Sequence, residues 1–194
     1  MDPVRNPFAP GAGSQPPELA GRAEVIQSAD IALKRVLQGR PAQSQMLLGL
    51  RGVGKTVLLN KIEQLAEQIG YVPSFIEAPE DKSLVELLYP KMHQALRKLS
   101  ISETAKSASH SALRALRSFA SAFKINVGDF EVSVDPEPVV ADSGNLEFDI
   151  TELFLKIGEA ARAAGRGWAL LIDEVQYLSQ AELGALIVAI HRVN

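Results

Sequence analysis

The sequence predicts an α/β protein in which helices cover both faces of a mostly parallel sheet. Apolar segments of strand length alternate along the chain with segments whose apolar residues recur at helical spacing. A glycine-rich loop, residues 49–56, lies between a predicted strand and a predicted helix. A second apolar run, residues 168–172, leads directly into the carboxylates Asp173 and Glu174. In open parallel sheets, ligands bind at the carboxyl ends of the strands, so both features belong to one kind of site.

The composition favours one globular domain and excludes several classes of protein. The chain has 194 residues, 46% of them apolar, and a formal net charge of −3. A protein that binds nucleic acid through its overall charge is usually strongly basic, so this net negative charge argues against that class. The absence of cysteine excludes a disulfide scaffold and thiol catalysis. No long apolar run and no signal peptide are present, so we expect a cytoplasmic protein without a membrane partner.

The predicted elements begin after an N-terminal arm. Residues 1–20 contain five prolines and predict an extended arm, and we expect one domain over residues 21–194. Residues 125–134 alternate around Gly128-Asp129 and predict a small β-hairpin, so we treat residues of about 100–140 as an inserted helical and hairpin segment. Strands are predicted over residues 45–50, 71–78 and 168–172, and helices over 24–37, 58–69, 83–99, 103–123, 149–164 and 179–190.

Three of these helices have a sequence that is typical of a capping box. In such a box, a Ser, Thr or Asp begins the helix and a glutamate follows three residues later, so each satisfies a backbone amide. The predicted pairs are Ser83 with Glu86, Asp149 with Glu152, and Ser179 with Glu182.

The glycine-rich loop fits the P-loop pattern G-x-x-x-x-G-K-[ST]. Its glycines allow backbone N–H groups to converge on phosphate oxygens, Lys55 can reach the β- and γ-phosphates, and the Thr56 hydroxyl is suited to Mg²⁺. The alternative is a glycine-rich turn beside a surface lysine, which would not explain the strand before it and the helix after it. The predicted phosphate-binding residues are Gly49, Gly52, Val53, Gly54, Lys55, Thr56 and Val57.

The acidic pair is similar to a Walker B motif. At the end of a buried strand, Asp173 can hold Mg²⁺ directly or through water, and Glu174 can act as the general base that polarises a water molecule. The alternative is an ordinary acidic turn after a buried strand. A glutamate beside the aspartate, together with the absence of a guanine-reading Asn-Lys-x-Asp segment, favours ATP over GTP. The predicted cofactors are therefore ATP and Mg²⁺.

With both motifs and the segment Leu19-Ala20-Gly21-Arg22-Ala23-Glu24, most of residues 17–194 resemble AAA+-type ATPases of the archaeal-ATPase, initiator-like and STAND group. The resemblance implies a P-loop NTPase three-layer sandwich and a homo-oligomer that forms through the nucleotide interface. It also implies that Gly21 and Arg22 lie against the adenine, although a turn that caps the first helix is an alternative. Gln176, in the Asp-Glu-x-Gln form of the family, is implied as a neighbour of the γ-phosphate, with a plain loop amide as its alternative.

The chain departs from the family at its end. It stops at Asn194, before the sensor strand, arginine finger and helical lid of a complete AAA+ core would follow. We therefore expect a truncated chain with a sheet that is incomplete at the C-terminus. ATP hydrolysis is expected of the full-length protein.

The charge distribution leaves the partners open. The segment from Lys91 to Lys124 contains seven basic residues and one acidic residue, whereas residues 125–152 contain eight acidic residues and no lysine or arginine. The basic segment could contact DNA phosphates, or it could pack beside the acidic segment and neutralise it. Three function classes remain: an ATPase, a nucleotide-gated switch of STAND type with little turnover, and a DNA-associated initiator or transposition helper.

Overall fold

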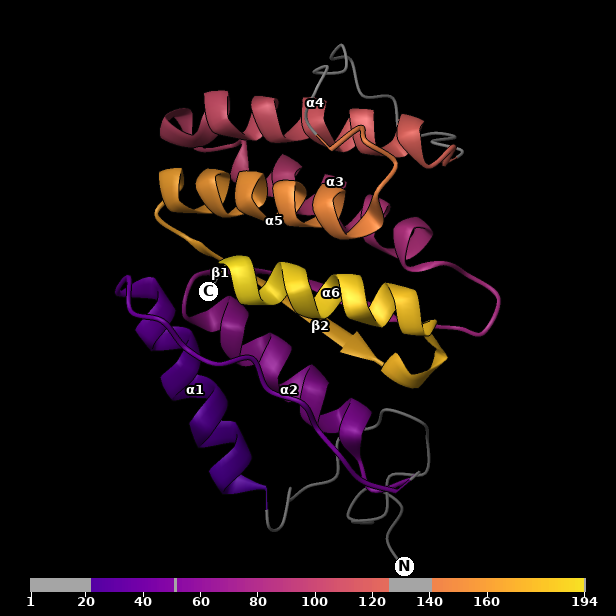
Figure 1. Ribbon diagram of the computed structural model, residues 1–194. Coiled ribbons are helices and arrows are strands. Elements are labelled where there is room, and N and C mark those ends of the chain that lie inside the picture. The colour runs from indigo at the N-terminus through magenta and orange to yellow at the C-terminus, as the bar shows by residue number, and fades with distance from the viewer. Residues whose placement is uncertain (1–21, 51, 126–140, 194) are drawn as a thin grey trace, which may run out of the picture. The chain divides into compact units, whose positions relative to one another are not determined.

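The computed structural model describes residues 22–50, 52–125 and 141–193 (Figure 1). The predicted N-terminal arm and, apart from Ile125, the predicted hairpin lie outside the described residues. The chain divides into two compact units, one that ends at Ile69 and one that begins at Gly70. None of the helices in the described ranges could span a lipid bilayer.

The first unit contains two helices that contact each other, α1 (Ala23–Leu37) and α2 (Lys55–Gln68). Both agree with the sequence prediction within a few residues. The helices bury few side chains: α1 buries Ala29, and α2 buries Val57, Leu58 and Ala66.

The strand predicted over residues 45–50 is not formed, and the chain there is irregular. Met46, Leu48 and Leu50 are 61%, 84% and 81% exposed. A strand exists through hydrogen bonds to a neighbouring strand, and among the described residues no strand pairs with this segment. The prediction was wrong because strand-like alternation of apolar residues cannot supply the partner.

The second unit contains a parallel pair of strands, β1 (Tyr71–Glu77) and β2 (Gly167–Asp173). The register places Tyr71 opposite Gly167 at the amino ends and Glu77 opposite Asp173 at the carboxyl ends. The helices and the parallel pairing support the predicted α/β class in its general form. In the part of the chain that the structure describes, the sheet has these two strands.

A close contact fixes the amino ends of the two strands. A Cβ on Gly167 would lie 2.2 Å from a ring carbon of Tyr71, so this position has no room for a side chain. Arg166 donates from Nε to the carbonyl of Gly70 and from Nη2 to that of Tyr71, both at 3.1 Å. The Tyr71 ring is buried, and this burial raises the pKa of its hydroxyl to about 12.

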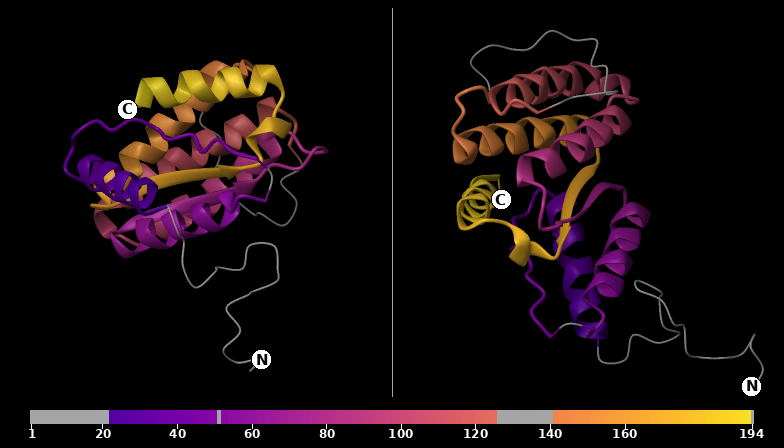
Figure 2. Two further views of the ribbon diagram at one scale, coloured as in Figure 1. Left: turned by 90° about the horizontal axis from the view of Figure 1, so that it is seen from below. Right: turned by 90° about the vertical axis from the view of Figure 1, so that its right-hand side faces the viewer.

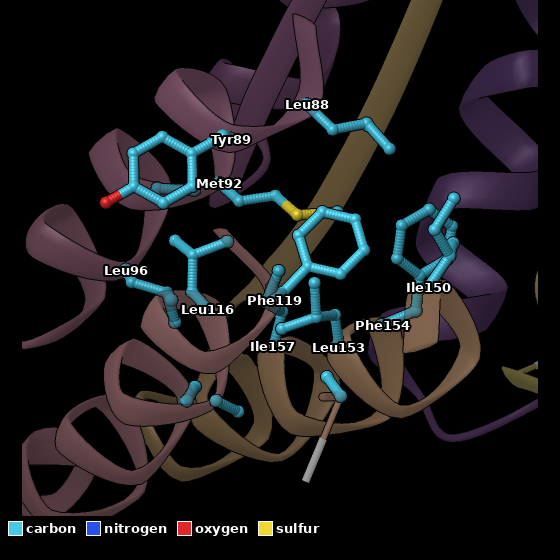
Figure 3. Packing of buried hydrophobic residues seen from close by; sticks show 14 of the residues in the cluster. Leu88, Tyr89, Met92, Leu96, Leu116, Phe119, Ile150, Leu153, Phe154 and Ile157 are labelled. Atoms are coloured by element: carbon cyan, nitrogen blue, oxygen red, sulfur yellow. The ribbon is translucent and has the colours of Figure 1, made fainter. Parts of the chain in front are cut away.

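The helices of the second unit enclose the main hydrophobic core. Helix α4 packs against α3 and α5, α5 also packs against α6, and α3 and α5 contact β1 and β2 respectively (Figures 1 and 2). Figure 3 shows Leu88 and Met92 of α3, Phe119 of α4 and Leu153 of α5 in this core. The segment that we expected to be an insertion therefore contributes α4 to the core. The bounds are α3 Leu84–Leu99, η1 Glu103–Ala105, α4 Lys106–Ala122, α5 Leu146–Ala163, η2 Val175–Tyr177 and α6 Gln180–Val193.

Two of the three predicted capping boxes form. In α3, the Ser83 Oγ accepts from the amide of Glu86 at 3.3 Å, and the Glu86 carboxylate accepts from the amide of Ser83 at 2.9 Å. The same reciprocal pair joins Ser179 and Glu182 at the start of α6. These helix starts could be predicted because both partners lie within one turn.

The prediction of a third capping box, Asp149 with Glu152, was wrong, because α5 begins at Leu146 and Asn145 is its N-cap. The Asn145 Oδ1 accepts from the amide of Phe148 at 3.1 Å. Asp149 is buried and accepts hydrogen bonds from the amide and the hydroxyl of Ser143 and from the amide of Gly144, at 3.2, 2.8 and 2.9 Å. The aspartate therefore fixes the loop that precedes the helix, and an asparagine four residues earlier takes the capping position.

Replacing Gly167 should destabilise the protein through its contact with Tyr71. In Gly167→Ala the new methyl group must displace a buried ring, and we expect the free energy of unfolding to fall by roughly 1–3 kcal/mol. Urea denaturation monitored by circular dichroism measures this change.

Gly158→Ala is the matched control for Gly167→Ala. Gly158 lies within α5, and a Cβ there would meet nothing within 4 Å. Because alanine favours a helix over glycine, this change should raise the stability by about 0.5–1 kcal/mol. A Gly167→Ala variant as stable as the wild type would contradict the close contact.

The stability should also depend on pH through His93. This side chain is buried in α3, where its ring stacks on Tyr89 at 6.3 Å, and burial together with the charge of Arg97 lowers its pKa below the ordinary 6.5. The folded protein thus binds the proton less readily than the unfolded chain, so the free energy of unfolding should fall as the pH drops below about 6.5. Thermal melts at about pH 7.5 and about pH 5.5 measure this effect.

His93→Phe should remove part of that pH dependence, because phenylalanine keeps a ring beside Tyr89 but binds no proton. His110→Gln, on the exposed side of α4, is the control and should keep the pH dependence of the wild type. Equal pH dependence in His93→Phe and the wild type would contradict the assignment.

Candidate nucleotide-binding site

The glycine-rich loop has the backbone geometry that its sequence predicts. Gly52 and Gly54 have φ values of 81° and 84°, in the left-handed region that favours glycine. Gly54 is also the N-cap of α2, where its carbonyl accepts the first helical hydrogen bond from Leu58 at 3.0 Å. The first N–H groups of any α-helix have no partner within the helix, and they lie at the positive end of its dipole. The loop therefore leads into a backbone suited to an anion.

The Lys55 side chain folds back over the start of the loop. Its Nζ donates to the carbonyls of Gly49 and Leu50 at 3.1 and 3.0 Å. A Cβ on Gly49 would lie 3.0 Å from the Cγ2 of Val53, so the start of the loop lies close to its middle. A positive charge and a helix start thus lie within one short, tightly curved segment.

Two further candidates follow in α2. Thr56 is the second residue of the helix and is half-buried, and Val57 after it is buried. The buried Val57 side chain leaves its backbone as the group that can contribute to phosphate binding. The role of Thr56 as a magnesium ligand stays a prediction.

Arg22 reaches the same loop from the start of α1. Its Nη2 donates to the carbonyl of Val53 at 2.8 Å, and its own carbonyl accepts from the amide of Ile26 at 3.1 Å. Arg22 therefore begins the first helix, as one of the two alternatives predicted, and its side chain also contacts the P-loop. Gly21 lies outside the described residues, and the position of either residue against adenine stays a prediction.

The acidic pair lies in the second unit, where β2 ends. Asp173 is the last residue of β2 and is only 4% exposed. Its Oδ1 accepts from the amide of Glu174 at 3.0 Å, and its carbonyl accepts from the amide of Ala78 at 3.1 Å. The second bond joins the chain after β1 to the end of β2. The carboxylate is therefore held at the carboxyl edge of the sheet, where the sequence predicted it.

Glu174 has an unusual backbone conformation. Its φ and ψ are 54° and 37°, a left-handed conformation that is uncommon for a residue with a side chain. The chain then forms the short helix η2, in which the amide of Tyr177 donates to the carbonyl of Glu174 at 3.0 Å. The side-chain amide of Gln176 donates to the Glu174 carboxylate, so the structure brings these two predicted residues together.

Two carboxylates near this edge were not among the predicted site residues. Glu77 lies opposite Asp173 in the register and is exposed. It could have been predicted, because the strand expected over residues 71–78 also has an acidic residue near its carboxyl end. Glu182, predicted only as a cap, also accepts from the amide of Leu84 at 2.6 Å, which no local pattern indicates. Among the described residues, no group of three or more Asp, Glu, His or Cys residues could hold a metal. Mg²⁺ does not need such a group, because it is usually held by one or two protein ligands together with phosphate oxygens and water.

A comparison with protein families covers the residues of both motifs. Residues 18–193 match the AAA ATPase domain family, a match that includes the P-loop and the acidic pair. Comparison with curated proteins and with solved structures gave no significant match. The family match agrees with the predicted resemblance in its general form, an ATP-binding P-loop protein, and does not distinguish the subgroups. Because it covers nearly the whole chain, the chain belongs to the AAA ATPase domain family.

Proposed function

We propose that the protein binds Mg²⁺-ATP through residues 49–57 and hydrolyses it with Glu174 as the general base. The observation that supports this most directly is the loop itself. Two left-handed glycines lead into the start of α2, and the Lys55 ammonium lies against the same loop. No other described segment combines a glycine-rich turn, a helix start and a cation in this way.

Phosphate binding would exchange neutral contacts of Lys55 for stronger ones. The ammonium now donates to two backbone carbonyls of the loop. An ionised phosphate oxygen adds direct charge attraction to the hydrogen bond with the ammonium, so phosphate oxygens are better acceptors than the carbonyls. The amides at the start of α2 would hold the same oxygens.

From the two sequence motifs, we propose Thr56 and Asp173 as the residues for the metal. A hydroxyl and a carboxylate are hard oxygen donors of the kind that Mg²⁺ takes together with phosphate oxygens and water. When bound, the ion would neutralise charge on the phosphates. The buried Asp173 carboxylate has one oxygen that accepts from the amide of Glu174, which fixes the orientation of the group.

Glu174 is proposed to accept the proton of the attacking water. The water oxygen forms a bond to the γ-phosphorus, the bond between this phosphorus and the β–γ bridging oxygen breaks, and ADP leaves. The contact with Gln176 orients the carboxylate on the turn after β2. General base catalysis of this kind contributes about 10²–10⁴-fold to the rate.

The nucleotide-gated switch is the second candidate. The Glu174 carboxylate already accepts a hydrogen bond from Gln176, which occupies an oxygen that would otherwise contact the attacking water. A protein that keeps this contact would retain ATP with little turnover. We also propose a cytoplasmic location, on the basis of the composition, and a homo-oligomer, as the family resemblance implies.

A DNA-associated ATPase is the third candidate, and it has one supporting observation. Arg97, Lys98 and Lys106 are exposed on the adjoining helices α3 and α4. Their charge could contact DNA phosphates. No residue pattern for reading bases accompanies them, so this function ranks below the other two.

Lys55→Ala should weaken Mg²⁺-ATP binding at least about tenfold, because each factor of ten corresponds to about 1.4 kcal/mol and charged contacts contribute on this scale. Isothermal titration calorimetry measures the dissociation constant. Lys61→Ala, on the same helix but outside the loop, is the matched control and should bind as the wild type does.

The nucleotide-site proposal fails if the wild type shows no saturable binding at millimolar ATP, or if Lys55→Ala binds ATP as tightly as the wild type.

Glu174→Gln should keep ATP affinity and lower the rate of phosphate release about 100-fold or more, since the amide cannot accept the proton. A coupled phosphate assay, with and without duplex DNA, measures the rate. Glu159→Gln, an exposed position on α5, is the control and should leave the rate unchanged.

Tight ATP retention without phosphate release in the wild type would support the switch over the ATPase. Activation by duplex DNA would support the third candidate.

A further inference from the structure

The Glu182 carboxylate lies at the start of two helices at once. Its Oε2 accepts from the amide and the hydroxyl of Ser179 at 2.9 and 2.7 Å, which closes the capping box of its own helix, α6. Its Oε1 accepts from the amide of Leu84 at 2.6 Å, and Leu84 is the first residue of α3. One side chain therefore satisfies free amides at both helix starts.

The two helices follow the two segments that leave the carboxyl edge of the sheet. Residues 78–83 connect β1 to α3, and residues 174–179 connect β2 to α6. The amide of Ala78 joins these segments at their beginning through its bond to the carbonyl of Asp173. Glu182 joins them again at their end, so the two segments are connected at both ends.

The turn that carries Glu174 is held between these two connections. It begins at Asp173 in the sheet and ends at Ser179, whose amide and hydroxyl are bonded to Glu182. Between them, Leu178 is buried and donates from its amide to the carbonyl of Val175 at 3.2 Å. With both ends fixed, the left-handed backbone of Glu174 has few alternative conformations.

The surroundings of Glu182 favour its charged form. Burial alone would raise the pKa of this carboxyl, but the hydrogen bonds from the Leu84 amide and from the Ser179 hydroxyl and amide outweigh it and lower the pKa below its ordinary value. The positive ends of two helix dipoles act in the same direction. A neutral amide at this position would lose much of this interaction, because an NH₂ group cannot accept a hydrogen bond.

We propose that Glu182 is a positioning residue that couples the segments after β1 and β2 and thereby holds Glu174 in place. The coupling is a property of this chain's own hydrogen bonds, and its consequence for catalysis rests on the proposed role of Glu174. Glu182 itself makes no contact with the reacting atoms in this account.

Glu86 supplies a matched control. It closes the same kind of box with Ser83 at the start of α3, and its hydrogen bonds among the described residues go to Ser83. Glu182→Gln and Glu86→Gln therefore remove the same local chemistry. Only Glu182→Gln also leaves too few acceptors for both helix starts, because glutamine has one acceptor oxygen where the glutamate uses two.

Hydrogen–deuterium exchange of the nucleotide-free protein, followed by mass spectrometry, tests the coupling. In Glu182→Gln we expect exchange in peptides that cover residues 174–179 to rise about tenfold or more, while Glu86→Gln keeps the exchange of the wild type there. Glu182→Asp is a second variant, because it keeps the charge but is one methylene too short to reach both helix starts. Unchanged exchange in the Glu182 variants, or equal loosening in Glu86→Gln, would overturn the proposal.

The phosphate-release assay tests the consequence. Glu182→Gln should lower kcat severalfold and leave ATP affinity unchanged, whereas a general loss of structure would weaken both. An unchanged kcat despite faster exchange would overturn the positioning role. If the wild type binds ATP but releases no phosphate, the proposed hydrolysis fails, and the exchange measurement still decides whether Glu182 couples the two segments.

Discussion

The parallel pairing of β1 with β2 is the constraint on which the rest of the second unit depends. Its register is fixed at one end by Gly167, which has no side chain to clash with the ring of Tyr71. At the other end, the same register places Asp173 beside Glu77. A slip by one residue would turn every side chain of a strand to the opposite face. The glycine contact at the amino ends therefore helps to determine where the acidic pair lies.

The long connection between these strands forms most of the core. Helices α3, α4 and α5 lie between β1 and β2 in the sequence. They pack on one another, and α3 and α5 also contact the strands (Figure 1). Phe119 of α4 is buried together with Met92 of α3 and Leu153 of α5 (Figure 3). The two strands that carry the carboxyl edge are therefore covered by helices from their own connecting segment.

The sequence predicted those features whose partners lie within a few residues. The boxes of Ser83 and Ser179 depend on a glutamate three residues later, and the left-handed loop before α2 depends on its own glycines. The start of α5 was misplaced because Asn145 and Asp149 both have side chains that can accept from backbone amides, and only the folded loop decides between them. The strand over residues 45–50 was wrong because pairing depends on a distant segment. For the same reason, no pattern indicated the bond from Leu84 to Glu182.

The left-handed backbone conformation of Glu174 also bears on function. A left-handed conformation costs an ordinary residue roughly 1–2 kcal/mol, and glycine would adopt it at much lower cost. Strained residues persist where the surrounding structure determines them, and they cluster at functional sites. Here the conformation of Glu174 is held by the end of β2, by the contact with Gln176 and by the hydrogen bonds of Glu182 to Ser179. Glycine would relieve the strain but would remove the carboxylate, so this conformation is consistent with the general-base role proposed for Glu174.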